Sequence, residues 1–231
     1  MGVQGVDTVD DVLTRIDRLV TSLPEDDGVA RFAGMYGDTT RLVAARLTGG
    51  YFVDPVFMNR LDVLFAMLFF DAVDPVGPPQ PRVVPKAWAP LVEERATVGV
   101  HPIQYALAGM NAHINHDLAL AVVAACEQAG TSPDDADVKT DYDRVNDLLA
   151  SIEARVRRSF LDECARQDDD RLGPVVHLVS SWSIEAARDA AWVAARTLWA
   201  LRPLEDVRDV YRASLARQVG LAGRVMLTPC L

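Results

Sequence analysis

Residues 102–129, with the sequence PIQYALAGMNAHINHDLALAVVAACEQA, are the basis of the fold prediction. Apart from one polar run it is apolar over a length typical of a long helix, and helices that are apolar on nearly every side lie buried in a core. Pro102 stands at its start and Gly130 directly after its end, the usual positions of these residues around a helix. We therefore expect a central helix around which the rest of the chain packs.

Segments with helical periodicity lie on both sides of this stretch. Their apolar residues recur every three to four positions, Pro, Gly and Asp separate them, and strand patterns are nearly absent. The expected helices cover residues 8–22, 29–47, 55–73, 86–96, 142–166, 174–201 and 203–222. The chain is predicted to be an all-α, single-domain bundle of about seven to eight helices over residues 1–231. Segments 55–73, 102–129 and 174–201 form its inner layer.

The segment 74–85 contains five prolines. Proline lacks a backbone N–H and clashes with the preceding helical turn, so this segment is predicted to be an extended connector. A helical pattern resumes at Lys86, so we expect a connector within one domain and not a domain boundary.

Composition narrows the classes of function. Hydrophobic residues make up 50% of the chain, which excludes intrinsic disorder, and the formal net charge of −10 argues against a nucleic-acid partner. The longest apolar runs, 63–70 and 118–126, are shorter than the roughly 18–20 residues of a membrane span. Three cysteines at spacings typical of no zinc or disulfide framework, and a start without a secretory signal, predict a reduced, cytoplasmic location.

The polar run inside the central segment points to a site. Five of the seven residues from Asn111 to Asp117 are polar, and such groups are costly to bury unless they bond to one another. Helical spacing places His113, His116 and Asp117 on one face and stacks Asn111 and Asn115 on another. The sequence therefore predicts a buried polar cluster on a central helix.

The other two inner segments add polar residues to this cluster. Asp62 lies among apolar neighbours in segment 55–73, and segment 174–201 carries Glu185, Arg188 and Trp192. A buried carboxylate needs a partner. We expect Arg188 to neutralise Asp62 or Asp117 across helices.

Three interpretations of the cluster stay open. In the first, His113 and Asp117 bind a divalent metal with Asp62 or Glu185, because ligands at i and i+4 share a helix face; the Glu-x-x-His pairs of di-metal bundles are absent. In the second, His113 acts as an acid or base oriented by Asp117 or Asp62. In the third, the cluster is a satisfied network that fixes helix register.

The residues of these segments resemble an uncharacterised bacterial helical family, a domain of unknown function. The resemblance covers about residues 28 to 201 and rests on Leu61–Ala66, Trp88, Gln104, the string Asn-Ala-His-Ile-Asn-x-Asp-Leu at 111–118, and Ala187–Trp192. The resemblance implies that the chain shares the helical fold and the polar site of this family. It does not indicate which reaction takes place there. His116 is not part of the family pattern, so the resemblance favours His113 and Asp117 over His116.

We therefore expect a soluble enzyme that acts on a small, largely apolar molecule by acid–base or metal-assisted chemistry. The candidate catalytic residues are His113, Asp117 and Asp62, the candidate substrate-binding residues are Asn111, Asn115, Arg188 and Trp192, and the candidate metal ligands are His113 and Asp117. The alternative is a non-catalytic helical binding or scaffold protein whose polar cluster is structural. The expected partners are a small-molecule ligand and a second copy of the chain, through apolar patches on the first and last helices.

Overall fold

Helices make up the computed structural model, which describes residues 6–73, 83–167 and 173–229. They are, in chain order, α1 (Val9–Ser22), α2 (Gly28–Ala44), α3 (Pro55–Val73), α4 (Ala89–Glu94), α5 (Pro102–Ala112), η1 (His113–Asp117), α6 (Leu118–Ala129), α7 (Ala136–Gln167), α8 (Gly173–Ser181), α9 (Ile184–Ala200) and α10 (Glu205–Met226). These ranges contain no strand, so the all-α prediction is confirmed. None of the described helices is both long and apolar enough to cross a bilayer.

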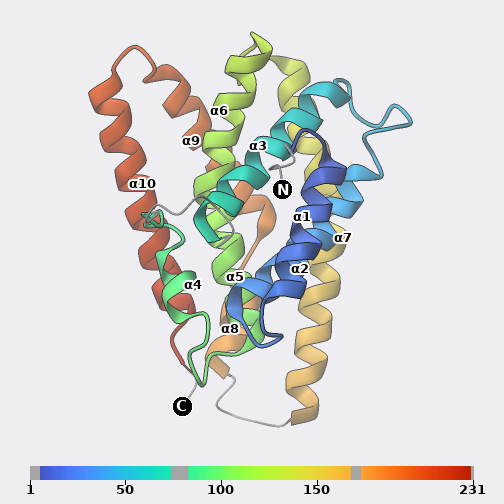
Figure 1. Ribbon diagram of the computed structural model, residues 1–231, viewed down its shortest axis with the longest axis vertical. Helices are drawn as coiled ribbons and strands as arrows, with labels where there is room; N and C mark the ends of the chain where they lie inside the picture. Colours follow the sequence, from blue (N-terminus) through green and yellow to red (C-terminus); the bar gives the residue numbers. More distant parts are fainter. Residues whose placement is uncertain (1–5, 74–82, 168–172, 230–231) are drawn as a thin grey trace.

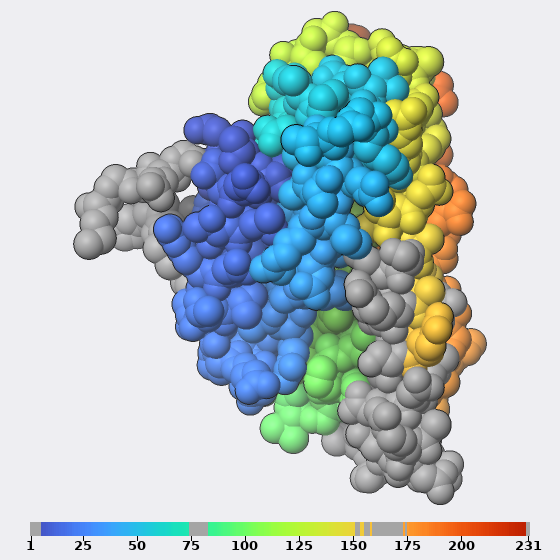
Figure 2. Space-filling view, turned by 90° about the vertical axis from the view of Figure 1, so that its right-hand side faces the viewer, coloured from blue at the N-terminus to red at the C-terminus, as the bar shows by residue number. Residues whose placement is uncertain are grey.

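The segments α5, η1 and α6 form a column through the middle of the molecule (Figure 1), as expected for residues 102–129. α2 packs against α5, while α3 and α9 pack against α6. α10 contacts α5 and α4 (Figure 1). Figure 2 shows the face on which α1 and α2 lie side by side, with α7 next to α2. The middle of the column is therefore surrounded by other helices.

Two apolar cores meet at this column. One contains fully buried Trp88 and Phe69 and lies between the N-terminal helices and α5. The other contains Phe57 and Tyr142 and lies between α3, α6, α7 and α9. Phe65 of α3 packs against both cores. Burying an aromatic or aliphatic side chain of this size contributes about 1.5–3 kcal/mol, so these contacts position the column.

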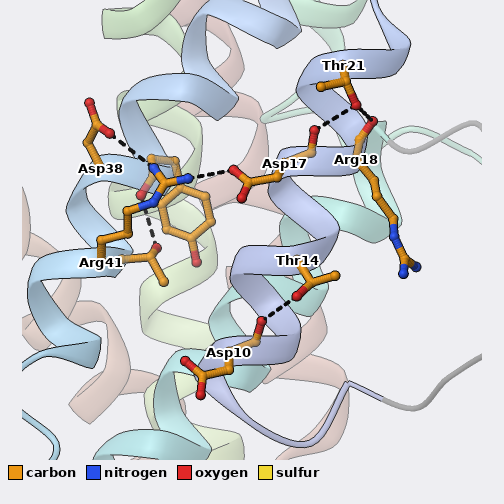
Figure 3. A network of polar contacts seen from close by, with 9 residues as sticks. Asp10, Thr14, Asp17, Arg18, Thr21, Asp38 and Arg41 are labelled. Atoms are coloured by element: carbon orange, nitrogen blue, oxygen red, sulfur yellow. Dashed lines mark hydrogen bonds and ion pairs between the residues drawn. The ribbon is translucent and has the colours of Figure 1, made fainter.

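The outer surfaces of α1 and α2 are joined by polar contacts (Figure 3). Arg41 of α2 donates hydrogen bonds to Asp17 of α1 at 2.6 Å and to Asp38 at 3.1 Å. All three side chains are exposed, and an exposed ion pair contributes at most about 1 kcal/mol. The buried apolar residues between α1 and α2 therefore hold the pair together.

Two helices that the periodicity predicts as continuous are interrupted. Segment 174–201 divides into α8 and α9, because the Ser183 side chain accepts a hydrogen bond from the Ala186 N–H and caps α9. Segment 102–129 contains the π-helical turn η1. The proline-rich connector falls mostly outside the described residues, and its described part, 83–85, is not helical. The single-domain organisation stays a prediction.

Candidate functional site

The polar run forms the π-helical turn η1 between α5 and α6. The Leu118 N–H bonds to the carbonyl of His113, five residues earlier, so the turn holds one residue more than an α-helical turn. Side chains of adjacent residues do not face each other in a regular α-helix. Here the Nδ1 atom of His116 lies 2.7 Å from Oδ1 of Asp117. A π-turn inside a helix is frequently found at a functional site.

Asp117 is the centre of the cluster and is 1% exposed. Its Oδ2 atom accepts a hydrogen bond from the Trp88 indole N–H at 2.8 Å and faces Nδ1 of His113 at 3.3 Å, while Oδ1 faces Nδ1 of His116. Burial alone raises the pKa of Asp117, but the hydrogen bonds from His113 and His116 outweigh burial and hold that pKa below its usual value. A charged carboxylate accepts from both imidazoles, so each ring carries its proton on Nδ1.

His113 lies inside an aromatic enclosure and is 2% exposed. Its ring stacks on Phe65, with ring centroids 3.4 Å apart, and Tyr36 packs edge-on at 4.6 Å. Burial lowers the pKa of His113 and outweighs the opposing effect of Asp117, so the ring is neutral. The enclosure is completed by Phe32, Phe69 and Trp88, with centroids 5.7, 5.9 and 6.0 Å from that of His113.

Two buried polar atoms in this region lack a hydrogen-bond partner among the described residues: Nε2 of His113 and Oδ2 of Asp62. Burial raises the pKa of Asp62 to about 7. Burial also raises the pKa of Tyr36, and the nearby charge of Asp62 raises it further, while a side-chain hydrogen bond with Thr40 opposes part of this rise. Buried polar atoms are nearly always paired. This part of the cluster therefore keeps hydrogen-bonding capacity that the protein itself does not use.

A pocket of about 650 Å³ opens on the other side of Asp117, between α3, α6 and α10. Its lining residues are Leu68, Asp71, Val83, Pro85, His116, Asp117, Leu120, Asp209, Arg212 and Ala213. A second pocket of about 410 Å³ shares Leu68, Asp71, Leu120 and Arg212 with it. The second pocket is completed by Leu64, Met67, Ala121, Val123, Ala124, Glu127, Leu198 and Arg208. We call the two together the α3–α6–α10 groove.

His116 and Asp117 bring the polar cluster to this groove. The Nδ1 atom of His116 is engaged by Asp117, and no described residue bonds to its Nε2 atom. A carboxylate that holds one ring nitrogen orients the imidazole and leaves the other nitrogen for proton transfer. His113 is enclosed and 2% exposed, whereas His116 is 7% exposed and lines the groove. The expected role of His113 as the acting imidazole stays a prediction.

The two asparagines of the predicted site lie toward α10. Asn111 donates a hydrogen bond to the Val219 carbonyl at 2.9 Å, and its Oδ1 atom accepts one from Asn115 at 3.2 Å. Neither asparagine lines the groove. In this structure they connect α5 and η1 to the last helix, and their expected role in substrate binding stays a prediction.

Arg188 and Trp192 lie at the contact between α9 and α7. Arg188 donates hydrogen bonds to the side chain of Asn146 and to the Tyr142 carbonyl, and its guanidinium lies 4.1 Å from the centroid of the Tyr142 ring. The Trp192 ring packs on Tyr142 at 4.5 Å. The expected ion pair of Arg188 with Asp62 or Asp117 is therefore not formed in the described structure. Arg188 instead joins two helices.

Among the described residues, the expected metal site lacks a third ligand. Within residues 6–73, 83–167 and 173–229, no three His, Cys, Asp or Glu side chains are placed to hold one ion. His113 and Asp117 direct their polar atoms at each other, and Glu185 is exposed at the start of α9. The arrangement fits hydrogen-bonded imidazole–carboxylate pairs better than a metal centre.

Sequence reasoning missed the part of the site that lies on α10 and the role of Trp88. Arg208 and Arg212 line the groove from a helix that has an unremarkable amphipathic sequence. The indole N–H of a buried Trp usually has a partner, and this rule is the signal that could have linked Trp88 to a buried acceptor such as Asp117.

The chain belongs to the family of unknown function DUF5995, whose model matches residues 9–229. Family membership thus agrees with the resemblance found in the sequence. Comparison with curated proteins and with solved structures gives no match.

Proposed function

We propose that this member of DUF5995 is an enzyme that performs general acid–base chemistry on a small, largely apolar molecule bound in the α3–α6–α10 groove. The observation that carries the proposal is the His116–Asp117 pair. Nδ1 of His116 lies 2.7 Å from the buried carboxylate, and both residues line a pocket of small-molecule size.

In this proposal His116 is the catalytic residue. Its Nε2 atom takes a proton from the substrate or from a water molecule, and the imidazolium that forms is stabilised by Asp117. The proton is then returned to the leaving group or the product. Trp88 and His113 are positioning residues, because they hold the Asp117 carboxylate from its other side. Positioned proton transfer of this kind accelerates a reaction by about 10²–10⁴-fold.

A second candidate is a non-catalytic binding protein whose cluster fixes the packing of the helices. It is favoured by the enclosure of His113, which is 2% exposed and whose ring is stacked on Phe65. Under this alternative the π-turn serves only to join the two cores.

Chemical modification separates the two candidates without knowledge of the substrate. Diethyl pyrocarbonate acylates accessible neutral imidazoles, and peptide mapping by mass spectrometry assigns each modified ring. We expect His116 to react in the folded protein and His113 to stay unmodified, with exposed His177 as the positive control. Equal protection of His113 and His116 would contradict the enzymatic proposal.

A screen of small acyl esters and lactones then tests the chemistry. The His116→Gln and Asp117→Asn variants should lose at least 100-fold in the rate of any reaction that the protein catalyses. The His177→Gln variant is the matched control and should keep the full rate. A rate that survives His116→Gln would remove this residue from the mechanism.

The proposal includes a cytoplasmic location and a homodimer. Exposed apolar side chains on the last helix support the dimer: Val207, Val210, Leu221 and Val225 are 51–69% exposed. Sedimentation velocity of the Val210→Glu, Leu221→Glu double variant tests it, because charges on this surface should leave a monomer.

A further inference from the structure

The α3–α6–α10 groove contains two arginines that the proposed proton transfer does not use. Arg208 and Arg212 lie one turn apart on α10 and both line the groove. The Nε atom of Arg208 is buried and has no hydrogen-bond partner in the described part of the chain. Arg212 meets Asp209 at 3.9 Å, the long limit of an ion pair, and both side chains are exposed. Arg208 forms no ion pair within the described residues, so a ligand carboxylate at its guanidinium would supply the missing negative charge.

The opposite wall of the groove is mainly apolar, with Asp71 and Glu127 as its charged residues. Its apolar side chains come from α3, α6 and α9, and most of them are half-buried, so they expose apolar surface to the groove. They are Leu64, Met67, Leu68, Leu120, Val123 and Leu198. A ligand with an apolar body would cover this surface and gain free energy in proportion to the area removed from water.

The carboxylates of the groove limit the charge of the ligand. Asp71, Glu127 and Asp209 also line it. A group with several negative charges would be repelled by them, whereas a single negative charge next to Arg208 and Arg212 is attracted by two positive charges, of which that of Arg212 is partly balanced by Asp209. The arrangement therefore selects an ion with one charge and an apolar remainder.

We propose that the groove binds an amphipathic carboxylate, with the carboxylate on Arg208 and Arg212 and the apolar body on the wall formed by α3 and α6. The inference rests on the proposed function and names its class of substrate. Arg212 and His116 line the same pocket, so a bound molecule of this kind extends from the arginines to the imidazole.

Calorimetric titration of the full chain tests the proposal with three probes of equal length: decanoate, decanol and decylamine, each below the concentration at which it forms micelles. At pH 8 decanoate is expected to bind at least tenfold more tightly than decanol, and decylamine more weakly than either. Tighter binding of decylamine would show that the carboxylates, and not the arginines, select the ligand, and would overturn the proposal.

Substitutions on α10 test whether Arg208 causes the tighter binding of decanoate. Arg208→Gln should weaken decanoate binding at least tenfold, the effect of losing a charge-assisted hydrogen bond, and leave decanol binding unchanged. Arg217→Gln, an exposed arginine of α10 outside the groove, is the matched control and should bind like the wild type. If Arg208→Gln is poorly folded by circular dichroism, Arg212→Gln replaces it. Unchanged affinity in the folded arginine variant would overturn the proposal.

The failure of this inference and that of the proposed function are distinguishable. Decanoate binding that depends on Arg208, without any effect of His116→Gln on a reaction, leaves the ligand class standing and removes the acid–base role. A reaction that needs His116 but proceeds equally with neutral and anionic substrates removes the ligand class alone.

Discussion

The buried carboxyl of Asp62 makes the stability of the protein depend on pH. Its Oδ2 atom has no hydrogen-bond partner among the described residues, and burial raises its pKa from 3.8 to about 7. The folded chain thus holds a proton that the unfolded chain releases near pH 4. The stability that this proton contributes is complete below pH 4 and is lost as the pH rises to about 7. A rise of this size corresponds to about 4 kcal/mol, at about 1.4 kcal/mol per pKa unit.

The Asp62→Asn substitution keeps the shape of the side chain and removes its ionisation. We expect the variant to gain up to about 4 kcal/mol over the wild type between pH 4 and pH 8, with most of the gain complete at pH 7.5. The lowered pKa of His113 acts in the opposite direction, because charging a buried imidazole destabilises the fold as the pH falls. This effect is present in both proteins, so their difference isolates Asp62.

Urea unfolding followed by circular dichroism, at half-unit steps from pH 4.5 to 8.5, measures this difference. Asp189→Asn, at an exposed position on α9, is the control and should show a difference that does not vary with pH. A difference between Asp62→Asn and the wild type that is flat over this range would mean that the carboxyl of Asp62 is solvated or paired in solution, and would contradict the raised pKa.

Two further substitutions test the packing around the site. Trp88→Phe removes the N–H that Asp117 accepts at 2.8 Å, and should destabilise the protein by about 1.5–3 kcal/mol in urea unfolding, as expected for a hydrogen bond to a charged group; a loss below 0.5 kcal/mol would contradict that hydrogen bond. Gly220→Ala would place a methyl group against the backbone carbonyl of Lys86 and should cost about 1–3 kcal/mol in thermal unfolding. Gly34→Ala, a helical glycine with open space around it, should stabilise by about 1 kcal/mol, and equal effects at both glycines would refute the close approach of α10.

The helices could be predicted from local sequence, because their boundaries depend on nearby residues. Pro55 and the apolar residues that follow predict the bounds of α3, and Gly130, with a φ of 68°, ends α6 in the left-handed conformation that glycine adopts readily. The break between α8 and α9 was missed, since the short polar interruption at Ser183 lies within a long periodic segment. Helical periodicity over the whole segment does not reveal that a single serine caps a new helix within it.

The sequence predicts some of the residues that lie together in the candidate site, but it does not predict the contacts that their side chains make. Clustered polar residues in an apolar helix pointed to His113 and Asp117, which do lie together. The π-turn is a rare local change of backbone hydrogen-bond register, and residue spacing that assumes a regular α-helix does not predict the contact between His116 and Asp117. The partner of Arg188 is set by the packing of α7 on α9, a long-range contact that spacing along the chain does not contain.

The π-helical turn changes the orientation of the α6 side chains relative to those of α5. Each residue of an α-helix turns the chain by about 100°, so one additional residue rotates everything after it relative to everything before it. α5 and α6 can therefore each direct an apolar face into a different core, although they form one continuous rod. A one-residue deletion within the turn would restore a regular helix. It would rotate the side chains of α6 away from α3 and α9, and it would also remove the contact between the imidazole of His116 and the carboxylate of Asp117. A change in chain length at this point would thus alter both the packing of the helices and the contact between His116 and Asp117.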